Sequence, residues 1–288
     1  MKVLVTGGAG FIGTNLIKRL LKDNHQVISF DNYSTGFKKN MQNDCHYIEV
    51  DISNSTHMDT YTNVYTSDVD VIFHMAALPR IKPSFKNPTE VIDVNVKGTV
   101  NILEHARKTE TPVIYAGSSS FWGGVYKNPY TFSKWQGEEL CKMYEQIYGL
   151  NVTICRFYNV YGDYMPMEGS YRTVLPIFLE QYRKGKTITV TGDGEQRRDF
   201  THVDDIVDAM MKVVQLNKWG SVYELGRGEN HSINELAEMF YDGHNITYIE
   251  PIPGEVRNTL CKSELARKKL KWKPKINVKE WLWEKLCK

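Results

Sequence analysis

The sequence predicts an α/β fold in which a doubly wound parallel sheet is followed by a smaller C-terminal domain. In the first half of the chain, short β-branched and apolar runs alternate with stretches of helical periodicity. A glycine-rich turn, GGAGFIG at 7–13, joins the first run to the first helical stretch. Beyond about Gly162 this alternation gives way to a loop-rich segment, marked by Pro166, Pro176 and the turn sequences at 192–194 and 251–254.

The individual elements follow from these patterns in chain order. We predict strands where apolar residues form short runs, at 2–6, 26–30, 46–50, 69–74, 113–116 and 152–156. We predict helices where apolar residues recur at helical spacing, at 11–21, 89–107 and 130–148. The sheet domain is expected to contain 1–165 and about 199–219, and the smaller domain 166–198 and 220–288.

The composition is that of an ordinary globular chain. With 288 residues, 41% of them hydrophobic, and a formal net charge of +2, the chain can bury a large core and shows no bias towards nucleic acid. No apolar run approaches the roughly 20 residues that span a bilayer, and Met1 leads directly into the first predicted strand without room for a signal peptide. The five scattered cysteines lack C-x-x-C spacing, which favours a reducing compartment and no metal site. We therefore expect a cytoplasmic protein without nucleic-acid or membrane partners.

The glycine-rich turn is suited to bind the pyrophosphate of a dinucleotide. Gly7 allows a tight turn, Gly10 lets the backbone approach the phosphates, and Gly13 lets the helix pack closely on the strand. Asp31 ends the second apolar run, at the distance where an acidic residue binds the adenosine ribose hydroxyls. A carboxylate there repels a 2′-phosphate, so NAD is favoured over NADP, with the lysines at 38–39 as the nearby feature that would favour NADP.

A second motif, YTFSK at 130–134, supplies a candidate base. Tyrosine has a pKa of about 10 in water and needs positive charge nearby to act as a base at neutral pH. Lys134 follows Tyr130 by four residues, so a helix places both on one face, and NAD⁺ adds further positive potential. Together with the dinucleotide turn, this pair predicts the reversible oxidation of an alcohol, in which tyrosinate takes the hydroxyl proton as hydride leaves for NAD⁺.

Further motifs follow in order along almost the whole chain. They are DNYSTG at 31–36, DI at 51–52, HMAAL at 74–78, NVKGT at 95–99, YAGSSSFWG at 115–123, RFYNVYG at 156–162, GDGEQRRDFTHVDD at 192–205 and PGEVRNT at 253–259. With the two motifs above, the chain resembles the extended short-chain dehydrogenase/reductase superfamily. Within it, the chain is similar to the NAD-dependent nucleotide-sugar epimerase/dehydratase family, which includes the UDP-glucose 4-epimerases.

This resemblance implies a Rossmann-type domain that binds NAD and a smaller C-terminal domain that binds a nucleotide sugar. It implies that Ser118 orients the substrate oxygen beside the catalytic pair Tyr130 and Lys134, and that Ser119 and Ser120 contact the substrate. The cofactor contacts that it implies are Gly7, Gly10, Phe11, Ile12, Gly13, Asp31, Asn32, Ser34, Thr35, Gly36, Asp51, Ile52, Ala76, Ala77, Leu78, Asn95, Tyr130 and Lys134.

The two residues after Ser118 bear on the reaction. Dehydratases of this family usually carry Asp-Glu directly after the catalytic Ser or Thr, and decarboxylases a Glu two positions after it, whereas this chain has Ser119 and Ser120. Epimerisation at carbon 4 needs no second base, because the 4-keto intermediate can turn over in the pocket and take the hydride back on its other face. We therefore expect a nucleotide-sugar 4-epimerase, an isomerase. A dehydratase or decarboxylase of the same family, or a catalytically silent NAD-binding regulatory protein, is the alternative.

The resemblance also implies substrate contacts in the second half of the chain. Asn159 and Arg198 match positions that hold the nucleotide diphosphate, and Glu255 matches an acidic position near the nucleotide ribose. Ile252 stands where many relatives have a second phosphate-binding arginine, and Arg257 replaces it only in part. UDP is therefore the expected nucleotide, and the sequence leaves the sugar open.

Two remaining features concern the sugar pocket and the assembly. Only 124–129 separate Gly123 from Tyr130, where relatives commonly have a longer loop, so we expect a wider pocket or one that a partner subunit covers. The predicted helices around 91–106 and 132–148 carry more apolar positions than one sheet-facing stripe requires. Relatives pair these helices across a two-fold axis, so we expect a homodimer.

Overall fold

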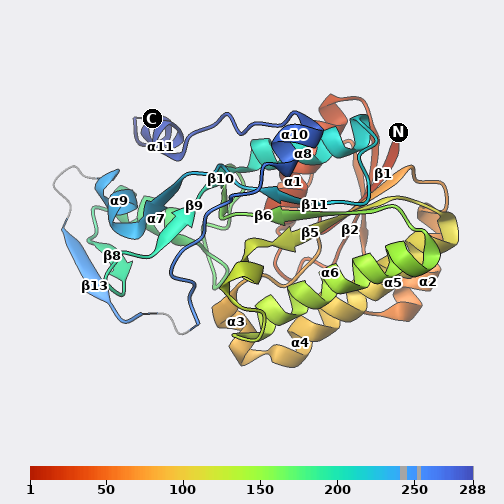
Figure 1. Ribbon diagram of the computed structural model, residues 1–288, viewed down its shortest axis with the longest axis horizontal. Coiled ribbons are helices and arrows are strands. Elements are labelled where there is room, and N and C mark those ends of the chain that lie inside the picture. The colour runs from red at the N-terminus through yellow and green to blue at the C-terminus, as the bar shows by residue number, and fades with distance from the viewer. Residues whose placement is uncertain (241–244, 252–253, 288) are drawn as a thin grey trace.

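A parallel sheet of seven strands forms the centre of the molecule (Figure 1). The computed structural model describes residues 1–240, 245–251 and 254–287. The strands lie in the order β11-β6-β5-β4-β1-β2-β3, and each neighbouring pair is parallel. Because the order reverses between β1 and β4, the sheet is doubly wound, as predicted. The strands are β1 (Lys2–Thr6), β2 (Gln26–Asp31), β3 (Cys45–Glu49), β4 (Val71–His74), β5 (Val113–Ser118), β6 (Val152–Phe157) and β11 (Val222–Leu225).

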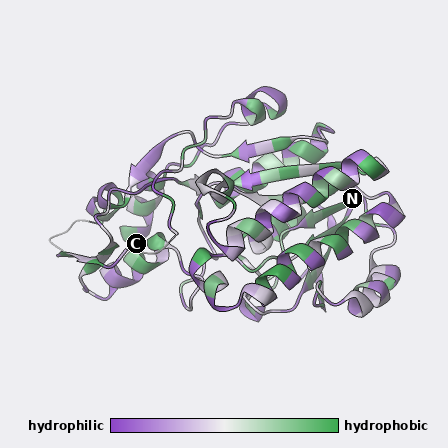
Figure 2. Ribbon diagram, turned by 60° about the horizontal axis from the view of Figure 1, so that its bottom comes forward, coloured by the Kyte–Doolittle hydropathy of each residue, from purple (hydrophilic) through white to green (hydrophobic). Residues whose placement is uncertain are grey.

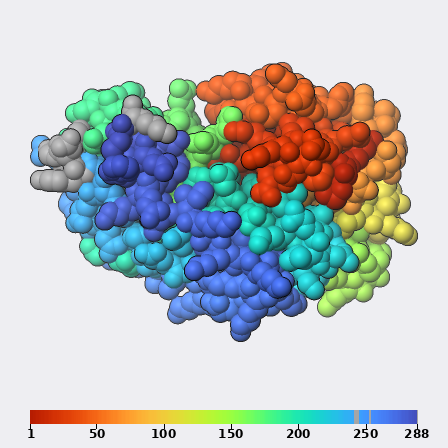
Figure 3. All heavy atoms as spheres, turned by 90° about the horizontal axis from the view of Figure 1, so that it is seen from above, coloured from red at the N-terminus to blue at the C-terminus, as the bar shows by residue number. Residues whose placement is uncertain are grey.

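Helices cover both faces of this sheet, and each set shares a separate hydrophobic core with it. Figure 3 looks onto the first face, where the N-terminal segment lies beside the helix at 203–215 and the C-terminal segment. The first face carries α1 (Phe11–Lys22), α8 (Val203–Gln215) and α10 (Leu265–Leu270). The opposite face carries α2 (Ser55–Tyr65), α5 (Gly98–Thr109) and α6 (Pro129–Tyr148).

The bounds of these helices follow from local chemistry. Asn128 caps α6 by accepting a hydrogen bond from the Thr131 amide at 2.8 Å, Pro129 fills the first helical position, and Gly149 ends the helix in the left-handed conformation. Figure 2 shows hydrophobic and hydrophilic residues alternating around the helices, as expected for helices with one face on a sheet. The helix predicted at 89–107 is continuous but irregular: α4 (Pro88–Ile92), the π-helical turn η2 (Asp93–Lys97) and α5 follow each other directly.

Short connecting elements lie close to the ends of the sheet strands. They are the 3-10 turn η1 (Lys38–Asn40), α3 (Ile81–Lys86) and the 3-10 turn η3 (Ser119–Gly123). Because all strands of the sheet are parallel, their carboxyl ends meet at one edge, where ligands of such folds bind.

A second region packs around a third hydrophobic core that includes Phe178, Leu236 and Trp281. In Figure 1 it lies beside the carboxyl edge of the sheet. Its elements are β7 (Val160–Tyr161), α7 (Val174–Arg183), β8 (Ile188–Thr191), β9 (Arg197–Asp199), β10 (Thr201–His202), β12 (Asn230–Ser232), α9 (Ile233–Glu238), β13 (Ile246–Ile249) and α11 (Val278–Leu286).

The structure differs from the predicted division of the chain at one place. The sequence assigned all of 220–288 to the second region, but β11 pairs with β6 at the edge of the main sheet. The helix α10 packs on β11 and α8, and its Leu270 belongs to the first core. The strand was missed because VYEL at 222–225 is short and has a buried glutamate in it. Within the described ranges, no helix is both long and apolar enough to cross a membrane.

Candidate active site

The glycine turn forms a backbone cradle between β1 and α1. Gly7 has a φ of +71°, and a Cβ there would lie 2.8 Å from the Ala76 backbone. A Cβ on Gly13 would lie 2.1 Å from the Gly7 carbonyl oxygen, so only glycine allows this close approach. Gly10 precedes α1 without a side-chain cap, which leaves the first-turn amides of Phe11 and the following residues directed at an anion. This cradle fits the pyrophosphate of NAD.

Asp31 ends β2 beside the cradle. Its carboxylate accepts hydrogen bonds from the Ala9 amide at 2.9 Å and the Tyr33 amide at 2.8 Å. Burial raises the pKa of Asp31, and these two hydrogen bonds oppose that rise. The carboxylate is therefore fixed between two loops, and each oxygen has a lone pair left for a ribose hydroxyl. Asn32 is exposed and accepts a hydrogen bond from the Ser34 amide at 3.1 Å.

The other predicted cofactor residues surround this turn from neighbouring strand ends. A Cβ on Gly36 would lie 2.9 Å from the Ala9 backbone, so glycine allows the two loops to come this close. Asp51 accepts hydrogen bonds from Ser53, and Ile52 is buried against Gly98. The side chain of the buried Asn95 does not point at an open site. It accepts a hydrogen bond from the Leu78 amide at 2.7 Å and donates to the Leu78 carbonyl and to Ser133 Oγ. Asn95 thus holds the loop that contains Ala76, Ala77 and Leu78.

Tyr130 and Ser118 come together at the end of β5. The Tyr130 hydroxyl donates to Ser118 Oγ at 3.4 Å, and Ser118 Oγ lies 2.9 Å from Ser120 Oγ. Ser120 also donates its amide to Ser118 Oγ at 3.2 Å, which fixes the start of η3. Ser119 is buried, so its side chain is less open to a substrate than that of Ser120. The predicted serine and tyrosine are thus neighbours, 12 residues apart in the chain.

Lys134 lies one helical turn after Tyr130 and is 5% exposed. Its ammonium stands 4.2 Å from the centre of the Tyr115 ring, a cation–π contact, and no described residue accepts a hydrogen bond from it. Burial lowers the pKa of Lys134 to about 8, and Glu138 opposes this fall. The lysine is therefore still charged at neutral pH, and its donors remain available to a ligand.

A buried ion network behind η3 was not predicted from the sequence. Arg156 donates to both oxygens of Glu138, at 2.7 to 3.1 Å, and contacts Glu224 at 3.3 Å. Its guanidinium also stacks on Phe121 at 4.0 Å, and Trp122 donates its indole N–H to Glu224 at 2.7 Å. The network joins α6, β6 and β11 to the turn that carries the serines. The motif RFYNVYG includes Arg156, but the two partners of this arginine lie 18 and 68 residues away in the chain, so no local pattern indicated them.

The predicted substrate residues in the second half of the chain all have partners within the protein. The largely buried Arg198 donates to the partly exposed Glu255 at 2.6 Å. Asn159 has a φ of +23° and donates to the Asp199 carbonyl and to Thr259 Oγ1. Arg257 lies apart, 65% exposed, in a two-pronged ion pair with Asp193 at 2.7 and 2.8 Å. Ile252, the other position in this comparison, lies outside the described residues.

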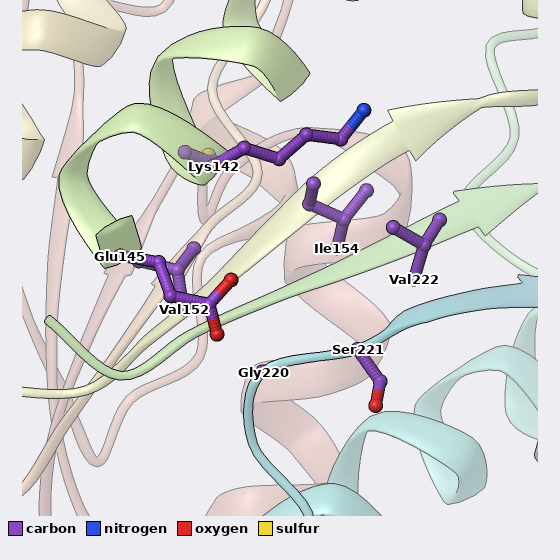
Figure 4. A pocket seen from close by; sticks show the side chains of 8 residues that line it. Lys142, Glu145, Val152, Ile154, Gly220, Ser221 and Val222 are labelled. Carbon is purple, nitrogen blue, oxygen red and sulfur yellow. The ribbon is translucent and has the colours of Figure 1, made fainter. Parts of the chain in front are cut away.

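Two surface hollows lie away from these residues. The hollow in Figure 4 has a volume of about 30 Å³ and lies between the end of α6 and the edge formed by β6 and β11, lined by Cys141, Ile154 and Val222 among others. It has room for about one water molecule and cannot hold a sugar. A second, of about 350 Å³, lies at the amino end of β1 and β2. No cluster of three or more metal-ligand side chains occurs in the ranges that the structure describes.

Comparison with known proteins agrees with this geometry. A model of the NAD dependent epimerase/dehydratase family matches residues 3–226. The chain is 35% identical to the putative UDP-glucose 4-epimerase of Methanocaldococcus jannaschii, over 96% of this chain and 95% of that protein. It is 32% identical to the UDP-N-acetyl-alpha-D-glucosaminuronate decarboxylase of Bacillus cytotoxicus, over 86% of this chain and 80% of that protein.

A solved structure extends the similarity to the fold. The UDP-glucuronic acid 4-epimerase from Bacillus cereus, in complex with UDP-glucuronic acid and NAD, is similar with a TM-score of 0.89 and 26% identity, covering 98% of this chain and 97% of that one. The chain therefore belongs to the NAD-dependent epimerase/dehydratase family, whose members act on nucleotide sugars.

Proposed function

We propose that this protein interconverts the C4 epimers of a UDP-linked hexose through a transient 4-keto intermediate. The observation that carries the proposal is the state of the carboxylate behind Ser118. Glu138 accepts a hydrogen bond from the Ser118 amide at 3.5 Å, and both of its oxygens are held by Arg156. It is therefore not free to serve as the second acid or base that eliminating water would require.

The residues of the site supply what epimerisation needs. Bound NAD would accept the C4 hydride and give it back. Tyr130 would take the proton of the C4 hydroxyl and return it after the sugar has turned over, a step of general base and then general acid catalysis. Lys134, one helical turn away and charged at neutral pH, would support this proton transfer. Ser118, already within 3.4 Å of the tyrosine hydroxyl, would orient the same substrate oxygen.

The nucleotide half of the substrate would meet Arg198 and Glu255. An arginine fork suits a diphosphate, and Asn159 lies on the loop that precedes β7 in the same region. The ion pair between Arg198 and Glu255 must then rearrange or share its charge when the diphosphate binds. The named relatives act on UDP-sugars, which supports UDP as the nucleotide.

The test is a panel of nucleotide sugars incubated with the pure protein, with products measured by mass spectrometry and proton NMR. We expect a product of unchanged mass that is inverted at carbon 4, formed without added reductant because the reaction regenerates its cofactor. A product lighter by water or by carbon dioxide would reject the epimerase proposal in favour of a dehydratase or decarboxylase. No conversion of any sugar, with NAD bound, would favour a regulatory protein.

We also propose that the protein is a cytoplasmic homodimer that pairs α5 and α6 across a two-fold axis. Fewer apolar side chains are available for this interface than the sequence suggested, because four of them are buried within the protomer. These are Val91, Ile102, Leu103 and Tyr144. Met143 and Ile147 remain 37% and 65% exposed on α6 and are available for an interface. All five cysteines are free thiols, which suits a reducing compartment. A monomeric mass by light scattering at micromolar concentration would refute the dimer.

A further inference from the structure

Arg80 begins α3, a short helix that packs on α6, the helix of the proposed catalytic tyrosine, although no motif pointed to it. It follows the cofactor loop at 76–78, two residues after Leu78. That loop is tied to α6 by Asn95, which bonds both Leu78 and Ser133 Oγ. Ser133 Oγ in turn donates to the Tyr130 carbonyl at 2.8 Å. The backbone of Arg80 is thus positioned by the same contacts that position Tyr130.

The backbone of Arg80 is strained. Its φ of +85° lies in the region that favours glycine, and its ψ is 138°. A non-glycine residue in such a conformation is destabilising and persists only where the surroundings impose it. The conformation begins α3 and brings the Arg80 side chain across to the second region, where Nε donates to the Tyr171 carbonyl at 3.0 Å.

Among the described residues, the guanidinium of Arg80 lacks the carboxylate partner that most other arginines have. Nine of the remaining arginines form ion pairs with carboxylates, and the tenth, Arg183, is exposed. In the part of the chain that the structure describes, Arg80 is only partly exposed, has no ion pair, and has no acceptor for its two terminal NH₂ groups. Burial lowers the pKa of Arg80, and the charge of ionised Tyr130 opposes this, so the two groups lie within each other's electrostatic field.

We propose that Arg80 binds a carboxylate on the sugar and that the substrate class is therefore a nucleotide-linked hexuronate; this rests on the proposed function. In a hexuronate the carboxylate is carbon 6, attached to carbon 5, the neighbour of the reacting carbon 4. A cationic group within the electrostatic field of Tyr130 is therefore suited to bind this carboxylate. The terminal NH₂ groups offer the planar donors that match a carboxylate, and a partly buried guanidinium gains most from such a partner. The bond to Tyr171 fixes the direction of the guanidinium.

The first experiment compares kcat/KM for UDP-glucuronate and UDP-glucose. We expect the native enzyme to prefer the uronate, and Arg80→Met to reduce the ratio of the two values by at least about tenfold, the size expected for losing one charged hydrogen-bond partner. Arg80→Lys keeps the positive charge but loses the planar guanidinium donors, so its ratio should lie between those of the native enzyme and Arg80→Met. The control is Lys82→Met, which removes an exposed positive charge from the same short helix and should leave the ratio as it is.

The second experiment separates this inference from the proposed function. Binding of both nucleotide sugars is measured by calorimetry in Tyr130→Phe and in Tyr130→Phe with Arg80→Met, where turnover does not interfere. Selective loss of uronate affinity supports the inference even if the product of the native enzyme is not a C4 epimer. Equal loss for both sugars, or a native preference for UDP-glucose, overturns it and leaves the epimerase proposal standing. Thermal unfolding and NAD content of each variant show whether it has folded.

Discussion

The cofactor side and the substrate side of the proposed active site are built from different chemical groups. The cofactor side consists of glycine backbone, helix amides and side chains such as Asp31 and Asn95 whose hydrogen bonds hold neighbouring loops. The proposed substrate side consists of charged side chains, and these charges neutralise one another in the pairs Arg198 with Glu255 and Arg257 with Asp193. The cofactor side is thus preorganised, whereas the substrate side must exchange internal ion pairs for contacts with a ligand.

The largest effect is expected from removing the hydroxyl of Tyr130, the proposed catalytic base. Tyr130→Phe should lower turnover by at least about a hundredfold, the typical contribution of a general base, while the affinity for the nucleotide sugar stays nearly unchanged. Turnover and the dissociation constant are measured by coupled assay and calorimetry. Near-normal turnover in this variant would reject the proposed mechanism.

The next test concerns the buried ion network of Arg156 and Glu138 behind the serine turn η3. Glu138→Gln leaves Arg156 without its main partner, and breaking a buried ion pair in this way costs about 3–5 kcal/mol of unfolding free energy. The matched control is its neighbour Glu139→Gln, which breaks an exposed pair with Lys142 and should cost less than about 1 kcal/mol. Urea unfolding at neutral pH measures both. Equal costs would mean that the network does not stabilise the serine turn.

The buried charge of Lys134 is expected to lower the stability of the folded protein, although the proposed reaction needs it. Its pKa falls from 10.5 to about 8 on folding, so the unfolded chain holds the proton more tightly. The charged form therefore penalises folding below about pH 8, and the penalty disappears as the pH rises from about 8 towards 10.5. Lys134→Met should abolish turnover yet raise the unfolding free energy of the NAD-free protein by up to about 3 kcal/mol at pH 7.

The measurement for Lys134 is urea unfolding of both proteins at pH 7 and near pH 10. The gain should shrink at the higher pH, because the lysine of the folded chain is then neutral and that of the unfolded chain, with its pKa of 10.5, has begun to lose its proton. A loss of stability in Lys134→Met at pH 7 would contradict this account.

On the substrate side, the two arginines should differ in their effect on UDP affinity. Arg198→Met removes a largely buried donor and should weaken UDP binding by about tenfold to a hundredfold, the value of a charged hydrogen bond. Arg257→Met removes an exposed arginine that already has a partner, and should weaken binding less than about threefold. Calorimetric titration with UDP measures both. A larger effect of Arg257→Met would show that it replaces the second phosphate-binding arginine of relatives.

The smallest effect is expected for added bulk on the sugar. The segment at 124–129 is short, and its Tyr126 is 80% exposed beside the start of α6, so we expect little to reject a larger group. An added group of methylene size changes discrimination by only about 1–3 kcal/mol. UDP-glucose and UDP-N-acetylglucosamine should therefore differ in kcat/KM by no more than about two orders of magnitude. Strict exclusion of the N-acetyl sugar would show that another segment closes the pocket.

The same comparison explains what the sequence could predict. The glycine turn and the β1 strand were predicted at the observed residues because they depend on neighbours within a few positions. Contacts set by tertiary packing were not predicted. Glu255 pairs with an arginine 57 residues away, and Asn95 holds the loop at 76–78. Arg80 is positioned by a strained backbone conformation that no local sequence pattern predicts. The strand at 222–225 was missed because its role as a sheet edge depends on β6.

That late strand has a consequence for how the chain is made. During synthesis, β6 emerges with its outer edge unpaired, and its partner β11 is not available until residue 225 has left the ribosome. In the interval the nascent sheet has an open hydrogen-bonding edge, and Arg156 lacks Glu224. Fragments that stop before β11 should therefore accumulate as aggregates, while those that extend beyond α10 can close the edge.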